Sequence, residues 1–228
     1  MLHQAVDTGG VGRREVAGEE QSLRRLSAQG GLALFVGESS PAHAAASSRL
    51  HARAPEEDHH LFVSPARTLP SVKHHVDAVP EGAPVRVIRT SRGADHDGRF
   101  DGIPTRAAVD QVNGSLRALG AAVSDAMEII AGRDAGRPVV CLRDVTSLTD
   151  DRYELERFLL ELRVAALSTN AVVHAHLPVA PDHEWLDGLE DLADATCYIE
   201  DEIPPLGEWD IKEETAEAGG VDAASSSV

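Results

Sequence analysis

The stretch LALFVGESSPAHAAA, residues 32–46, indicates how this chain folds, because an apolar strand meets a helix within it. Residues 32–36 are all apolar and include Phe35 and Val36, a composition that favours a buried strand. Gly37 ends this run, and Pro41 suits the first turn of a helix, where its missing N–H needs no intrahelical partner. The sequence therefore predicts a strand, a turn at Gly37 and a helix.

The alternation of strand and helix continues along the chain. Short apolar runs bounded by Gly, Pro, Asp or Asn predict strands at 32–36, 60–64, 85–89, 138–143, 171–177 and 195–199. Helical patterns predict helices at 41–52, 69–79, 105–131, 151–168 and 183–192. Apolar strands separated by helices are typical of a parallel sheet covered on both faces. We therefore expect an α/β fold, a three-layer sandwich with a mostly parallel sheet.

The two ends of the chain differ in composition from its middle. Residues 1–28 are polar and irregular, with the pattern of one short helix over 19–28, and we interpret them as an N-terminal extension. Residues 203–228 hold paired prolines, acidic residues and a Gly-, Ala- and Ser-rich end, which bury too little apolar surface to become ordered. We expect one domain over 29–202, followed by an acidic disordered tail.

The chain is strongly acidic, with a formal net charge of −17, two lysines and nineteen arginines over 228 residues. Concentrated salt screens the repulsion within such a surface, so the charge indicates adaptation to salt and argues against nucleic-acid partners. No apolar run is long enough for a membrane span, and no leader pattern is present, so we expect a cytoplasmic protein. Cys141 and Cys197 lie in apolar runs and are interpreted as buried free thiols.

The turn at Gly37 stands where a Walker-type phosphate loop, G-x-x-x-x-G-K-[ST], would lie. With Gly37 as the first glycine, Ala42 replaces the second, His43 replaces the lysine and Ala44 replaces the hydroxyl that would hold Mg²⁺. Glu38 adds a negative charge where phosphate would sit. Each lost charge-assisted contact is worth about 1.5–3 kcal/mol. We therefore expect no ATPase activity and no cofactor, and we regard nucleotide binding as doubtful.

A second element typical of nucleotide sites is the apolar strand PVVCLRD, residues 138–144, whose last residue occupies a Walker B position. The segments LALFVGESSPAHAAA, PVVCLRDVTSLTD, TNAVVHAHLP and DLADATCYIE, in this order, resemble the RecA/KaiC-like branch of the P-loop ATPases over about 26–201. The resemblance is to degenerate haloarchaeal members of the transducer-like type. It implies a RecA-like sheet and places Gly37, His43 and Asp144 at the positions of a degenerate nucleotide site.

The resemblance and the missing loop residues together predict a catalytically inactive protein with a regulatory or scaffolding role in signalling. Its partners would be proteins or further copies of itself. The charged side chains of helix 151–168 offer one docking surface, although a solvated face explains them as well.

The histidines leave other functions open. His174 and His176 lie two apart on a strand and so point to one face. We interpret them as hydrogen-bonded core residues and predict no metal site, with a metal pair as the weaker alternative. The alternative functions are an atypical nucleotide-binding sensor and a metal-dependent hydrolase that uses His43, His174, His176 and Asp144.

Overall fold

The computed structural model describes residues 26, 28–38, 40–65, 69–90, 106–133 and 136–199. Its centre is a seven-stranded sheet in which every pair of neighbouring strands is parallel, in the order β4-β3-β2-β5-β6-β1-β7. The strands are β1 (Gly31–Val36), β2 (His59–Pro65), β3 (Val85–Thr90), β4 (Ala107–Val112), β5 (Pro138–Leu142), β6 (Val172–Leu177) and β7 (Ala195–Tyr198). Strand β6 thus lies between β1 and β5.

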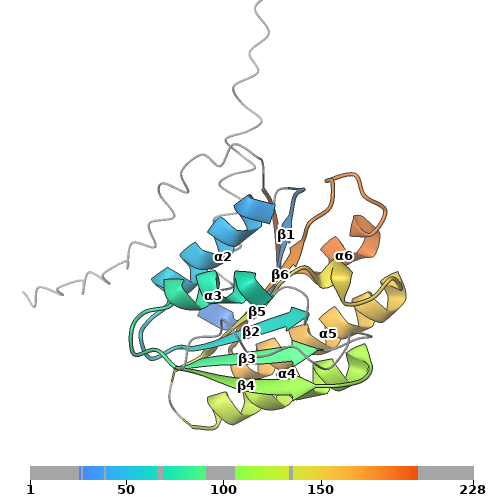
Figure 1. Cartoon of the computed structure of the whole chain (residues 1–228). Helices are drawn as coiled ribbons and strands as arrows, with labels where there is room; N and C mark the ends of the chain where they lie inside the picture. Colours follow the sequence, from blue (N-terminus) through green and yellow to red (C-terminus); the bar gives the residue numbers. More distant parts are fainter. Residues whose placement is uncertain are drawn as a thin grey trace, which may run out of the picture.

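Helices cover both faces of the sheet, so the predicted three-layer α/β sandwich is confirmed (Figure 1). Helices α2 (Ser40–Arg53) and α3 (Leu69–Ala78) contact each other on one face. Helices α4 (Leu116–Ala131), α5 (Arg152–Thr169) and α6 (Leu186–Leu192) cover the other. The short 3-10 helix η2 (Val145–Ser147) follows β5. Among the described residues, no helix has both the length and the apolar composition that a membrane crossing requires.

The prediction of one helix over 105–131 is wrong in its first part, because residues Ala107–Val112 form the edge strand β4. Ala107, Val109 and Val112 of β4 are only partly buried and its other three residues are exposed. Asp110 pairs with Arg86 of β3 at 3.5 Å. The polar edge lacks the continuous apolar run that revealed the other strands. Asn113 and Gly114 end the strand, and the Ser115 hydroxyl then accepts the Ala118 N–H to begin α4.

The two faces of the sheet differ in chemistry. Under α4 and α5 lies one continuous apolar cluster that includes Leu34, Val140, Val173 and Phe158. Under α2 and α3 the apolar side chains form two smaller clusters, one around Phe35 and one around Phe62. Histidines fill the space between these clusters, and several of them are almost completely buried: His43, His51, His60, His75, His174 and His176.

The predicted extension and tail fall outside this description. Of residues 1–28, the structure describes only 26 and 28, and the acidic tail over 203–228 lies wholly outside the described residues.

Candidate functional site

The turn after β1 is closely packed against the chain that follows β7. The Gly37 N–H donates to the Leu177 carbonyl at 3.3 Å, and the Ile199 N–H donates to Val36 at 2.7 Å. A Cβ atom at Gly37 would lie 2.3 Å from the Ile199 carbonyl oxygen. Gly37 is therefore needed for close backbone packing, and its amide is already bonded within the fold.

His43 points inward from the first turns of α2 and is only 6% exposed. Its Nε2 atom lies 2.7 Å from the Gly37 carbonyl oxygen, and its Nδ1 atom lies 3.0 Å from Nδ1 of His176. Burial lowers the pKa of His43, although the bond to Gly37 and the nearby Asp144 charge act in the opposite direction. The ring therefore closes the turn as a neutral hydrogen-bonding group.

His43 is the first of five imidazoles joined in a chain beneath α2. His176 Nε2 lies 3.0 Å from His174 Nδ1. His174 Nε2 lies 3.2 Å from His51 Nε2, and His51 Nδ1 lies 2.7 Å from His60 Nδ1. The chain runs from the carboxyl end of β1 to the amino end of β2, where His60 lines a pocket of about 160 Å³.

The Gly37 carbonyl fixes the direction of the ring protons, because a carbonyl oxygen only accepts. His43 must donate through Nε2, so its Nδ1 accepts the Nδ1–H of His176. His176 Nε2 then accepts the Nδ1–H of His174. The same logic makes His51 donate to His174 and His60 donate to His51. Five neutral rings thus satisfy every bond of the chain with one proton each.

Burial explains why these rings stay neutral, since it penalises the charged form. It lowers the pKa of His60 to about 4 and the pKa of His174 to about 3. For His51 and His176 burial, reinforced by the neighbouring histidines, holds the pKa well below the usual value. At neutral pH these histidine rings carry no charge.

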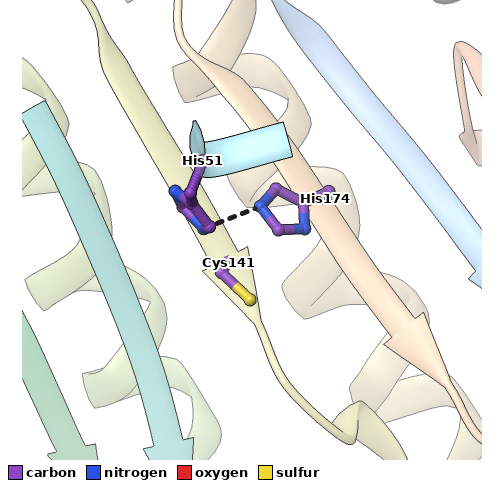
Figure 2. Close-up of side chains that lie close together, drawn as sticks. All are labelled: His51, Cys141 and His174. Carbon is purple, nitrogen blue, oxygen red and sulfur yellow. Dashed lines mark hydrogen bonds between the residues drawn. The ribbon is translucent and has the colours of Figure 1, made fainter. Parts of the chain in front are cut away.

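One group within this region combines three potential metal ligands: His51, Cys141 and His174 (Figure 2). All three are buried, and one ring nitrogen of each histidine and the Cys141 Sγ atom lie within 4.8 Å of one another. The Cys141 Sγ atom also lies 3.3 Å from the Ser47 hydroxyl. Burial raises the pKa of the Cys141 thiol to about 12, so without a bound cation the Cys141 side chain is a neutral thiol.

The local sequence builds this region through two periodicities. His43, Ser47 and His51 lie four apart on α2, which places them on the face that meets the sheet. Strand pairing sets Cys141 of β5 opposite His174 of β6. Because side chains alternate along a strand, His174 and His176 share the face beneath α2.

The structure brings together some of the residues that the sequence singled out. Gly37 and His43 are directly bonded, and His174 and His176 share a face as predicted. Asp144 has a left-handed backbone with φ of 48°, and its carboxylate accepts the Thr146 hydroxyl at 2.6 Å. The Asp144 charge acts on the His43 ring, but no hydrogen bond joins these two residues among the described contacts.

Sequence reasoning missed His51, regarded a metal site at the pair His59 and His60 as weak, and interpreted Cys141 as a buried free thiol. The four-residue spacing of His43, Ser47 and His51 was an available signal for one polar face on α2. Cys141 and Cys197 are both buried and are not joined in a disulfide, as predicted. Their proximity to other donors depends on sheet register, which the sequence does not reveal.

Comparison with known proteins adds one assignment. No curated protein matches the sequence. Among solved structures, the chain is similar to PCH-2 from C. elegans at 13% sequence identity, with a TM-score of 0.31. That alignment covers 69% of this chain and 41% of the PCH-2 chain, a likeness too distant to inform function. A family model described as a family of unknown function, DUF7504, matches residues 30–199, and the chain belongs to this family.

Proposed function

We propose that this chain is a RecA/KaiC-like domain that does not hydrolyse ATP and that regulates or scaffolds a protein partner in signalling. The observation that carries the proposal is the position of His43. In a working phosphate loop a lysine ammonium at this point meets the β and γ phosphates. Here the side chain is turned inward, bonded to Gly37 and His176, and neutral.

The rest of the turn supports the same function. Ala42 is buried and has no polar side chain, and Glu38 is exposed with its negative charge beside the turn. The Gly37 N–H, which in a phosphate loop would face the ligand, is bonded to Leu177. A nucleotide would have to break these bonds and would gain no cationic side chain in return.

A protein partner is favoured by the outer face of α5. Two of its arginines are engaged within the fold: Arg152 pairs with Glu156 and Arg163 with Asp194, each at 2.7 Å. Large apolar side chains remain exposed on the same helix: Tyr153 73%, Leu160 42%, Val164 60% and Leu167 46%. We call these four residues the α5 stripe. Exposed apolar side chains gathered on one helix face favour burial against another protein.

Nucleotide binding is tested by thermal unfolding of the full chain in concentrated KCl, with and without Mg²⁺-ATP. We expect an unchanged Tm, because the closed turn should not bind the nucleotide. Binding would be detected, since a ligand present at 100 times its Kd stabilises the folded state by about 2.7 kcal/mol. A rise of several degrees would overturn the proposal and favour the alternative function, an atypical nucleotide-binding sensor.

The partner surface is tested with the double variant Leu160→Asp and Val164→Asp. Exposed positions tolerate a charge, so the variant should fold with a Tm close to that of the unaltered chain. We expect the double variant to lose self-association, measured by sedimentation, or to lose its capture of partner proteins from a lysate at native salt. Arg157→Gln, an exposed position on the same helix, is the matched control and should retain both. Equal binding by both variants would contradict a role for the α5 stripe.

A further inference from the structure

We infer that His51, Cys141 and His174 form a binding site for one zinc-class divalent ion beneath α2. This inference does not depend on the proposed regulatory function. The three ligands come from three different elements, α2, β5 and β6, so a bound ion would join the helix to two strands of the sheet (Figure 2).

The spacing of the donor atoms carries the first step of the argument. In a tetrahedral zinc site, bonds of about 2.0–2.1 Å to nitrogen and about 2.3 Å to sulfur hold the ligand atoms roughly 3.4–3.7 Å apart. The two Nε2 atoms of His51 and His174 are 3.2 Å apart, and one ring nitrogen of each histidine and the Cys141 Sγ atom lie within 4.8 Å of one another. Only small side-chain movements are needed for all three to reach one ion.

The hydrogen-bond chain carries the second step. Starting from the Gly37 carbonyl, it leaves Nε2 of His174 without a proton, so a lone pair already points toward His51. His51 presents its own Nε2 lone pair when its ring proton moves from Nε2 to Nδ1. The new Nδ1–H of His51 then donates a hydrogen bond to Nδ1 of His60, 2.7 Å away. His60 then carries its proton on Nε2. The number of protons on the five rings does not change.

That arrangement matches the usual surroundings of a ligating histidine, whose second nitrogen donates to a neighbouring group. His174 Nδ1–H donates to His176, which is held in turn through His43 by the backbone of Gly37. His51 Nδ1–H would donate to His60. Both candidate ligands therefore have their ring orientation fixed before an ion arrives.

The donor types select the class of ion. Two imidazoles and one thiol suit Zn²⁺ and its analogue Co²⁺, whereas Mg²⁺ and Ca²⁺ prefer oxygen ligands. On binding, Cys141 releases its proton and the thiolate forms the metal–sulfur bond. The buried Ser47 hydroxyl, 3.3 Å from the Cys141 sulfur, offers an oxygen for a fourth position. No redox change is required.

The test uses the full chain, stripped of metal with a chelator and titrated with Co²⁺ in concentrated KCl. We expect one equivalent to bind, with the visible bands of tetrahedral cobalt and the near-ultraviolet charge-transfer band that a thiolate ligand produces. One equivalent of Zn²⁺ should remove both signals. A folded chain that gives neither band would overturn the inference, since the histidines and Cys141 would then form a hydrogen-bonded core only.

Two cysteine variants separate the proposed ligand from the other buried thiol. Cys141→Ala should lose the charge-transfer band, whereas Cys197→Ala, also buried and lying outside the group, should retain it. The reverse result would overturn the assignment. If Cys141→Ala does not fold, His174→Gln provides the second variant, and the zinc content of the purified unaltered chain provides the second measurement. We expect about one zinc ion per chain. A protein purified from medium that contains trace zinc, with no bound zinc and no binding of added Co²⁺, would contradict the site.

Discussion

The His43 ring donates to the Gly37 carbonyl across 2.7 Å, and this bond closes the turn between β1 and α2. The same ring accepts from His176, so the turn is connected to a chain of imidazoles that crosses the sheet beneath α2. In the function that we propose, His43 corresponds to the phosphate-binding lysine of an active P-loop protein, and its ring is part of the buried interior. The closed turn and the histidine chain are therefore one structural unit.

Removing the His43 ring should weaken the fold. His43→Ala leaves the Gly37 carbonyl and the His176 Nδ1–H without their partner, and each buried unsatisfied group costs about 1–3 kcal/mol. We expect a loss of about 2–4 kcal/mol in the free energy of unfolding, measured with guanidinium chloride. His74→Ala, at an exposed position, is the control and should change the free energy by less than about 0.5 kcal/mol. Equal effects would argue against a closing role for His43.

The Gly37 position should not accept a larger side chain. A Cβ atom there would lie 2.3 Å from the Ile199 carbonyl, and overpacking of this kind costs about 1–3 kcal/mol. Gly37→Ala should lower the Tm, measured by circular dichroism. Gly132→Ala, where the nearest atom is 3.3 Å away and φ is −73°, is the milder comparison. A Gly37→Ala chain as stable as the Gly132→Ala chain would show that the turn is open.

The buried His75 predicts acid sensitivity. Burial, and then the charge of Arg143, lowers the pKa of His75 to about 3, while an unfolded histidine has a pKa near 6.5. Between these two values the unfolded chain binds the proton and the folded chain does not, so stability falls as pH falls from about 6.5 toward 3. Above about 6.5 this ring has no effect on the pH dependence.

Replacing His75 should remove its share of that sensitivity. Neither ring nitrogen of His75 finds a hydrogen-bond partner within the described part of the chain. His75→Leu should therefore be neutral or stabilising at pH 7, and should gain about 2 kcal/mol more at pH 5, at about 1.4 kcal/mol per pH unit. Chemical unfolding at both pH values measures this difference. His74→Gln should show no such gain, and a His75→Leu chain that weakens with acid as steeply as the unaltered chain would contradict the account.

The carboxylate of Asp194 should anchor the start of β1. It accepts the Leu32 N–H at 2.9 Å and pairs with Arg163 of α5 at 2.7 Å. Burial acts to raise the pKa of Asp194, but these bonds hold that pKa below its usual value. The contribution of Asp194 to stability is therefore present above about pH 4 and is lost in acid. Asp194→Asn should cost about 1–3 kcal/mol at pH 7. The exposed Asp191→Asn is the control, and an equal loss in both variants would contradict this role.

The order of the elements could be predicted because six of the strands are apolar runs between helical patterns. Strand β4 could not be predicted, because its edge position leaves half of its residues exposed and its sequence has no continuous apolar run. The pairing of His174 and His176 on one face followed from the period of a strand. The contact of His174 with His51 could not be foreseen, since it joins residues 123 positions apart through the packing of α2 on the sheet.

Nitrogen-15 NMR of the histidine rings, recorded at pH 7 with and without Mg²⁺-ATP, tests the closed turn most directly. The account predicts that His43 is neutral, with its proton on Nε2 and a bare Nδ1, and that ATP leaves its signals unchanged. A His43 ring protonated on both nitrogens, or ring signals that shift as ATP is added, would contradict it.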